Sequence, residues 1–136
     1  MSFRTKDNTN EVLDALEEAI ERGLEAIGMR AERHAKRDPN MPVDTGLARN
    51  SIAHAVSGKG ASIKEYKADR GDGKGSYSGT APNDKEKAVY IGSNVEYFPY
   101  IEEGGKNIDA RHVLRRAATE HTEEYKKLMV DSMKNA

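Results

Sequence analysis

The stretch NEVLDALEEAIERGLEAIGMRAERHAKR, from Asn10 to Arg37, decides how this chain folds. Its apolar residues recur in steps of three and four, which places them along one stripe of an amphipathic helix. They are Leu13, Leu16, Ile20, Leu24, Ile27 and Ala31. Acidic residues crowd the start and basic residues the end, which complements the helix dipole. Because Asp38-Pro39 disfavours continuation, we expect one long helix over Asn10–Arg37.

Two features of this predicted helix allow more than one interpretation. Gly23 and Gly28 each weaken a helix by about 1 kcal/mol relative to alanine. They either mark the close approach of another backbone or are merely tolerated, and we favour tolerance. Asn8, with Glu11 three residues later, resembles a capping pair. Residues 1–9 are polar, so they predict a flexible end without a secretory signal.

The segment after this helix combines turn residues with a strand pattern. Asp44-Thr45-Gly46 predicts a structural turn, and the Asp44 side chain is suited to cap a short helical turn that runs through Arg49. The sequence SIAHAVS, Ser51–Ser57, alternates as a strand does. We expect a second strand over Ser62–Tyr66 to pair with it through a glycine-containing turn.

The next segment has two parts of opposite character. Residues 69–87 are rich in glycine, lysine, aspartate and serine, with almost no apolar side chain to bury, so they predict a mobile loop. Their Gly71-x-Gly73-x-Gly75 pattern lacks the strand, helix and Lys-Ser/Thr ending of a phosphate loop. The sequence AVYIG, Ala88–Gly92, then predicts a short strand.

The densest aromatic patch of the chain lies in SNVEYFPYIEEGG, Ser93–Gly105. Tyr97, Phe98 and Tyr100 fall within four residues, and Glu102 follows closely. This stretch is too apolar for a free loop, so we expect it to pack on the core or on a partner. Aromatic anchors with a polar rim are typical of protein interfaces.

The C-terminal part predicts a second long helix, Asp109–Met133, with Asp109 as its cap. We expect its inner face to comprise Val113, Leu114, Ala117, Ala118, His121, Tyr125, Leu128 and Met129. The sequence thus predicts a single α+β domain over residues 1–136. Its two long helices would pack on a small antiparallel sheet.

Composition excludes several classes of function. The chain has 136 residues, 36% hydrophobic and 33% charged, which allows one modest core and a heavily charged surface. A net charge of −1 gives no global basic field for nucleic acid. Without cysteine there is no disulfide, thiolate metal site or Cys nucleophile. No apolar run approaches the roughly 18 residues of a membrane span, so we expect no membrane partner.

Catalytic chemistry finds little support in the sequence. The four histidines are scattered, and none has a ligand partner at zinc-motif spacing. Adjacent carboxylates such as Glu102 and Glu103 do not converge on one substrate, and no nucleophile elbow is present. We therefore expect no enzyme activity, no catalytic residue, no cofactor and no metal, and we disfavour a small hydrolase.

A basic cluster opens the predicted second helix. Arg111, Arg115 and Arg116 lie in its first two turns, where cations oppose the helix dipole at a cost of about 0.3–1 kcal/mol each. One interpretation is that they meet an anion, such as DNA phosphate or carboxylates of a neighbouring subunit. The other is that Glu102, Glu103 or Asp109 of the same chain pairs with them. Both interpretations stay open.

Three segments in order resemble one protein family. Pro42–Ser51, PVDTGLARNS, resembles a PVDTG-x-L-R-x-S signature, and Ile91–Gly104 resembles a strand followed by Gly-x-Asn-Val-x-Tyr and Tyr-hydrophobic-Glu-x-Gly. Ala110–Ala117, ARHVLRRA, resembles Ala-Arg-Pro-Phe-Leu-Arg-Pro-Ala. Order and spacing are similar to the tail-completion, or head–tail joining, family of long-tailed phages and prophages, the gene-product-ten-like family of lambdoid phages. The resemblance covers roughly Glu11–Val130.

This chain departs from the family pattern at several positions. His112 and Arg116 stand where the family often has proline, and Val113 stands where it has phenylalanine. Ala48 adds one residue between Leu47 and Arg49. These departures leave the expected fold intact but weaken any transfer of individual subunit contacts.

The resemblance implies a structural virion protein that completes the tail. It implies self-association into a ring of six copies at the top of the tail tube, with the tail-tube protein and head connector proteins as partners. DNA would pass through the lumen without sequence-specific binding. The protein would reside at the tail–head junction of the virion, and in the host cytoplasm during assembly. The alternative is a small nucleic-acid-binding or regulatory module that uses Arg111, Arg115 and Arg116.

Overall fold

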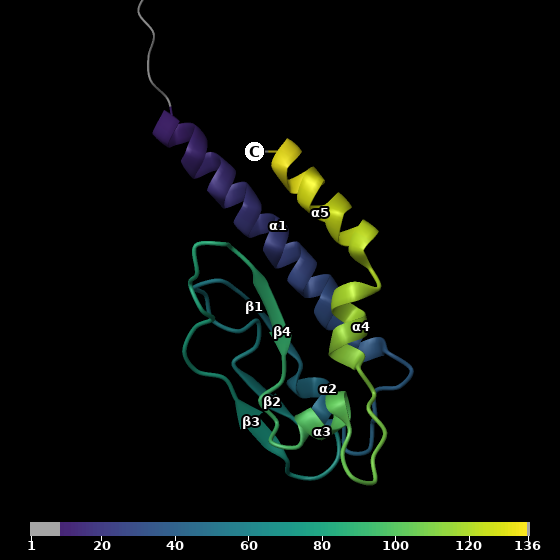
Figure 1. The fold of residues 1–136 in the computed structure, drawn as a ribbon. Helices are drawn as coiled ribbons and strands as arrows, with labels where there is room; N and C mark the ends of the chain where they lie inside the picture. Colours follow the sequence, from purple (N-terminus) through teal and green to yellow (C-terminus); the bar gives the residue numbers. More distant parts are fainter. Residues whose placement is uncertain (1–8, 136) are drawn as a thin grey trace, which may run out of the picture.

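The structure is a computed structural model and describes residues 9–135. The predicted capping residue Asn8 and the predicted flexible segment up to residue 8 lie outside this range. Thr9 is the first residue of helix α1, Thr9–Arg37, so the long first helix is confirmed to within one residue. The predicted α+β class is also confirmed, with α1 packed against small antiparallel sheets (Figure 1).

The remaining elements are short and follow in the order α2, β1, β2, β3, β4, α3, α4, α5. Their bounds are Leu47–Ser51, Ala53–Val56, Glu65–Lys67, Lys74–Ser76, Val89–Gly92, Phe98–Glu103, Val113–Thr119 and Thr122–Lys134. The hydrophobic core lies where α1, α2, α3 and α4 meet, around Ile52, Phe98 and Val113. The core therefore gathers at one end of the molecule, and α1 extends away from it beside α5 (Figure 1).

The strand pairing differs from the expected hairpin. β1 pairs antiparallel with β4, from Ala53 opposite Gly92 to Val56 opposite Val89, and β2 pairs with β3. The predicted partner of β1, Ser62–Tyr66, is hydrogen-bonded to it through Ser62, which donates a backbone hydrogen bond of 2.7 Å to His54 O and accepts one of 3.0 Å from His54 N at its hydroxyl. The reason is burial. β4 can lie against α1 with Val89 and Ile91, whereas the charged side chains around β2 require solvent.

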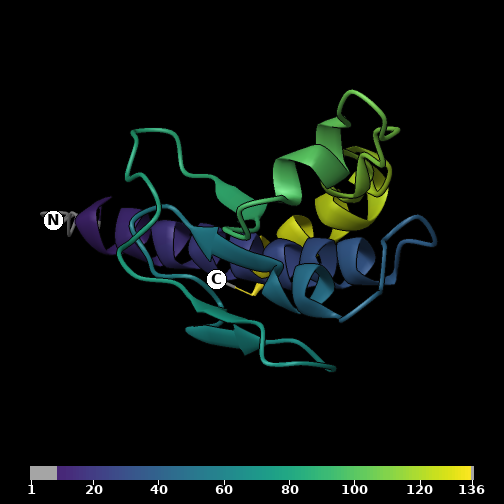
Figure 2. The ribbon, with the colours of Figure 1, turned by 90° about the horizontal axis from the view of Figure 1, so that it is seen from below.

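The segment 69–87 contains regular structure where a loop was predicted. Strand β3 lies within it and pairs with β2 at the edge of the molecule (Figure 2). Tyr77 orders this segment, because its ring packs against the core and its hydroxyl donates a hydrogen bond of 2.6 Å to Ser51 O. Packing of Tyr77 on the core and the pairing of β3 with β2 together order this polar segment.

Side chains of other elements, rather than another backbone, approach the two glycines of α1 closely. A Cβ atom on Gly28 would lie 2.4 Å from His54 Cδ2, and one on Gly23 would lie 2.6 Å from Met129 Sδ. The fully buried line of α1 consists of small residues: Ala19, Gly23, Gly28, Ala31 and Ala35. The predicted leucine–isoleucine stripe is only half-buried, and Leu13 is exposed. α1 therefore packs closely through its small residues.

The predicted second helix is two helices with a different start. The helix is interrupted at Glu120–His121, so α4 covers the core while α5 runs along α1 (Figure 1). A single straight helix could not satisfy both contacts. Asp109 does not cap α4, which begins four residues later after His112 in a left-handed conformation at φ 49°. Of the predicted inner face, Val113, Ala117 and Tyr125 are buried, but Ala118 is exposed.

Candidate functional site

The turn before α2 is built by backbone geometry. Gly46 has φ 86°, in the left-handed region that favours glycine, and an added Cβ would lie 2.4 Å from the Asp69 carboxylate. The predicted Asp44 cap is wrong, because α2 has no side-chain cap at its N-cap residue. Thr45 Oγ1 instead accepts a hydrogen bond of 3.3 Å from Leu47 N. The turn thus depends on Gly46 and Thr45.

This turn is tied to the segment that joins β2 to β3. Thr45 O accepts hydrogen bonds from Asp69 N at 2.7 Å and from Arg70 N at 3.1 Å. The Asp69 carboxylate forms an ion pair with Arg49 and accepts a hydrogen bond of 3.0 Å from Asn50 Nδ2. Polar residues of the first motif therefore hold the β2–β3 pair against α2.

Ser51 connects the first motif to the second. Its hydroxyl donates to Ala48 O at 2.6 Å and lies 2.5 Å from the hydroxyl of Ser93. The Ser93 hydroxyl accepts a hydrogen bond of 3.1 Å from Val95 N, which shapes the entry to α3. Two segments more than 40 residues apart are thereby joined at a buried point.

The aromatic patch divides between core and surface. Phe98 is 2% exposed and sits in the core, as expected for part of this stretch. Tyr97 and Tyr100 are 44% and 58% exposed. The second motif therefore contributes two buried apolar anchors, Val95 and Phe98, and an exposed aromatic surface at the start of α3.

Glu102 connects the second motif to the third. Its carboxylate accepts hydrogen bonds from Leu114 N at 2.8 Å and Arg115 N at 3.0 Å, at the start of α4. It therefore satisfies helix N–H groups that have no partner within the helix, and its negative charge suits the N-terminal end. Glu102 is buried and supports α4 rather than facing solvent.

The predicted basic cluster does not stay together. Arg116 forms two hydrogen bonds of 2.9 Å with Asp38, and Arg115 lies 3.3 Å from a Glu103 carboxylate oxygen. Arg111 precedes α4 and donates to Asn40 O at 3.4 Å. Burial raises the pKa of Asp38, but hydrogen bonds from Arg116 and from the Asn40 backbone outweigh burial. The pKa therefore lies below its usual value, and the carboxylate is ionised. All three guanidinium groups thus have partners in the same chain.

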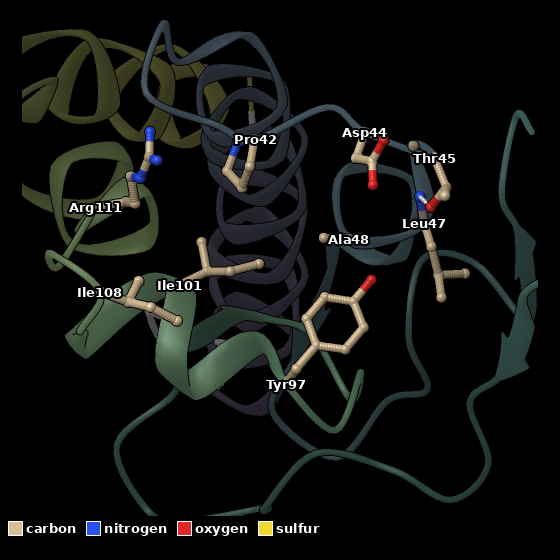
Figure 3. A pocket seen from close by; sticks show the side chains of 10 residues that line it. Pro42, Asp44, Thr45, Leu47, Ala48, Tyr97, Ile101, Ile108 and Arg111 are labelled. Carbon is tan, nitrogen blue, oxygen red and sulfur yellow. Dashed lines mark hydrogen bonds between the residues drawn. The ribbon is translucent and has the colours of Figure 1, made fainter. Parts of the chain in front are cut away.

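A surface pocket lies between the first motif and α3. It has a volume of about 360 Å³ and is lined by residues 42 and 44–48 together with Tyr97, Ile101, Ile108 and Arg111 (Figure 3). In Figure 3 the Tyr97 ring lies beneath Ala48, with Ile101 and Ile108 on the side of Arg111. We call it the motif pocket, because residues from all three sequence motifs line it.

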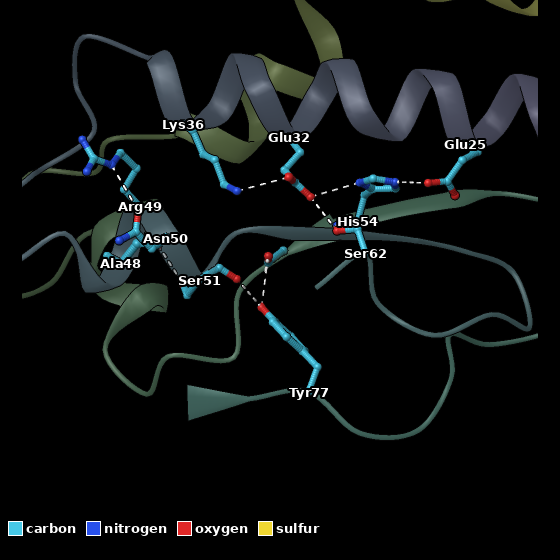
Figure 4. Close-up of polar contacts among 11 residues, drawn as sticks. Glu25, Glu32, Lys36, Ala48, Arg49, Asn50, Ser51, His54, Ser62 and Tyr77 are labelled. Carbon is cyan, nitrogen blue, oxygen red and sulfur yellow. Dashed lines mark hydrogen bonds and ion pairs between the residues drawn. The ribbon is translucent and has the colours of Figure 1, made fainter. Parts of the chain in front are cut away.

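A second arrangement surrounds the buried side chain of His54. Its Nδ1 lies 3.0 Å from Glu32 Oε1 and its Nε2 lies 2.6 Å from Glu25 Oε1 (Figure 4). Burial lowers the pKa of His54, but the bonds to Glu32 and Glu25 raise it above its usual value. Burial raises the pKa of Glu32, yet hydrogen bonds from His54, Ser62 and Lys36 lower it to about 2. This is a charged network that fastens β1 to α1.

Comparisons with models of known protein families, with curated proteins and with solved structures found no match. Among the described helices, none has both the length and the apolar character needed to cross a bilayer. The function is therefore inferred from the residues and geometry of this chain.

Sequence reasoning missed two histidine clusters. His54 meets carboxylates of α1 from another element, and His34 of α1 meets His121 and Glu124 near the start of α5. Only His121 and Glu124, three residues apart, are close in sequence, and each cluster joins residues from different elements. The break between α4 and α5 also positions His121, and the sequence predicted a continuous helix there.

Proposed function

We propose that this chain is a tail-completion protein that joins head to tail in a phage or prophage virion. The observation that carries the proposal is the junction of three motifs. The segments that resemble the tail-completion family are linked through Ser51 to Ser93 and through Glu102 to the start of α4. They line one pocket, although they are widely separated in sequence.

The motif pocket is better suited to protein contact than to catalysis. Its lining is mostly apolar, and large apolar side chains beside it are exposed to solvent. These exposed residues are Val43, Tyr97, Tyr100 and Ile108. Polar groups at its rim already support the fold: Thr45 O holds the β2–β3 connection and Arg111 bonds the chain at Asn40. An apolar centre with a polar rim is the composition of a protein interface.

A ring requires two different surfaces on each subunit, and the chain offers two. One is the exposed surface around the motif pocket. The other is the start of α1, where Val12 and Leu13 are 60% and 55% exposed. They lie at opposite ends of the molecule (Figure 1). We infer that the first surface of one copy contacts the second surface of the next, in a ring of six around a DNA lumen.

The tail tube and the head connector would then contact the two faces of this ring. The DNA would pass through without base-specific contacts, consistent with the near-neutral charge of the chain. The alternative nucleic-acid-binding role gains no support from the arginine cluster, because Arg115 and Arg116 pair with carboxylates and Arg111 bonds backbone.

Deletion of the coding sequence from the genome that carries it tests the proposal. We expect DNA-filled heads and tails of normal length that fail to join, visible by electron microscopy. Supplying the wild-type chain from a plasmid restores joined particles. Normal virions from the deletion strain, or portal, capsid and tail-tube genes missing from the neighbourhood, would overturn the proposal.

A further inference from the structure

A cluster of two histidines and a glutamate lies between α1 and α5, away from the motif pocket. His34 comes from α1, His121 precedes α5, and Glu124 lies in the first turn of α5. All three side chains are half-buried, and one ligand atom of each lies within 4.8 Å of the others. The helix break at His121 therefore brings together three groups that bind metal ions in proteins.

The rings of His34 and His121 are stacked, with centroids 3.5 Å apart and planes 2° from parallel. His34 Nε2 lies 3.0 Å from Glu124 Oε2, while Arg30 donates to the other Glu124 oxygen at 3.1 Å. Among the residues the structure describes, the His121 ring contacts His34 and Tyr125 but forms no hydrogen bond. Its nitrogen atoms are thus the uncommitted members of the cluster.

We propose that His34, His121 and Glu124 bind a divalent transition-metal ion of the zinc class. Two imidazole nitrogens and one carboxylate oxygen are a ligand set that zinc favours, with water as the fourth ligand. Ligand atoms around tetrahedral zinc are about 3.3 Å apart. The His34–Glu124 separation of 3.0 Å is close to that distance.

Coordination requires one change of geometry. An imidazole lone pair lies in the plane of its ring, so two parallel stacked rings cannot both point at one ion. One ring must turn about its Cβ–Cγ bond and leave the stack. His121 is the ring that turns, because no hydrogen bond to another described residue holds it. Bound metal would then link α1 directly to the start of α5.

Electrostatics sets the expected strength of binding. Arg30 and the N-terminal end of α5 are positive and oppose a cation. We therefore expect micromolar affinity rather than the tighter binding of sites without such neighbours. The proposal does not depend on the assembly role.

A second group, Glu102, Glu103 and His112, also has ligand atoms close together. Both oxygens of Glu102 accept backbone N–H groups of α4, so a metal there would compete with the start of that helix. We base no proposal on this group, but its histidine and carboxylates remain unchanged in every variant of the metal-binding test and serve as an internal control.

The test is metal titration of the full chain after treatment with a chelator. Calorimetry with Zn²⁺ should give one ion per chain, and Co²⁺ should give visible absorption typical of four-coordinate cobalt. Affinity should weaken between about pH 7.5 and about pH 5.5, because protons compete for imidazole. Far-UV circular dichroism verifies that each protein is folded. No saturable binding of either metal would overturn the proposal.

Variants assign the binding to these residues. H121Q and E124Q should each weaken Zn²⁺ binding by about tenfold or more, because each removes a ligand atom. The matched control is E123Q, which changes an exposed carboxylate next to Glu124. It should bind as wild type does. H34Q adds a fourth measurement, and H121Q alone suffices if H34Q fails to fold. Binding that persists unchanged in H121Q would overturn the proposal.

Discussion

At the scale of single residues, His54 is the most informative side chain of this protein. It is 3% exposed, yet both ring nitrogens lie beside carboxylates, an arrangement that suits the imidazolium form. A buried cation of this kind stabilises the fold only while its partners remain ionised, since an unpaired buried charge is costly. The contact between β1 and α1 should therefore depend on pH.

We predict that the stability difference between wild type and E32Q is largest from about pH 4.5 to about pH 6.5. The Glu32 pKa falls from 4.5 to about 2 on folding, so its contribution is complete above 4.5 and disappears as pH falls toward 2. The His54 pKa is raised above 6.5, so its contribution is complete below 6.5 and disappears as pH rises through the raised value. Chemical denaturation across this range measures both limits.

In that window we expect E32Q to lose about 2 kcal/mol of unfolding free energy, because the imidazolium keeps its burial but loses the more buried of its two ion partners. E25Q is the matched control. It removes the more exposed of the two partners, so its effect should be clearly smaller. A difference between wild type and E32Q that stays constant from acid to alkaline pH would contradict the predicted linkage.

The sequence predicted whether a side chain is buried only where neighbouring residues form a clear apolar pattern. Phe98 belongs to a dense aromatic patch and was expected to pack, and it does. Glu102 carries no local sign that it supports α4, because its partners are backbone N–H groups 12 and 13 residues away. His54 alternates as a strand residue should, but its carboxylate partners lie on α1. Contacts between polar groups on different elements leave no periodic pattern in the sequence, so these partners could not be predicted.

At the scale of elements, α1 depends on its small residues. We predict that G28A destabilises the protein by about 1–3 kcal/mol, although alanine is the better helix former. The added Cβ would lie 2.4 Å from the His54 ring and 2.8 Å from Val89, which would push β1 and β4 away from α1. Thermal unfolding measures the loss. R33A, at an exposed site on the same helix, should change stability little.

The start of α4 gives a second test at this scale. We predict that E102A costs about 1–2 kcal/mol, because it removes two hydrogen bonds to backbone N–H groups at a helix terminus. E103A is the matched control, since its neighbouring carboxylate is exposed and pairs only with a solvent-facing Arg115. Equal losses in E102A and E103A, measured by urea unfolding, would show that Glu102 does not support α4 in this way.

Elements were predictable where a long periodic pattern exists and less so where pairing is distant. The 29 residues of α1 carry their own period, so both ends were placed closely. The α4–α5 break has no proline or glycine, and both halves share one apolar pattern. It follows from contacts, because Val113 must reach the core while Tyr125 reaches α1. Strand β1 was placed correctly, but its partner was not, since several short segments could pair with it.

At the scale of the whole molecule, two groups of exposed apolar residues lie at opposite ends (Figure 1). The start of α1 presents Val12 and Leu13, and the surface around the motif pocket presents Tyr100 and Ile108. If the same surface of two copies met, assembly would stop at a dimer. If different surfaces meet, each copy binds two neighbours and a ring can close. The proposed ring requires the second case.

We predict that L13D and Y100D each remain folded monomers where the wild-type chain assembles. Each change places a charge in one proposed contact and touches no buried residue, because both side chains are exposed. An equal mixture of the two variants should form 1:1 dimers and nothing larger, since the intact surface of each meets the intact surface of the other. Sedimentation-velocity ultracentrifugation separates these species. M29D, at an exposed apolar site midway along α1 and outside both surfaces, should assemble normally. A mixture that stays monomeric, or rings from either single variant, would contradict head-to-tail contact between these two surfaces.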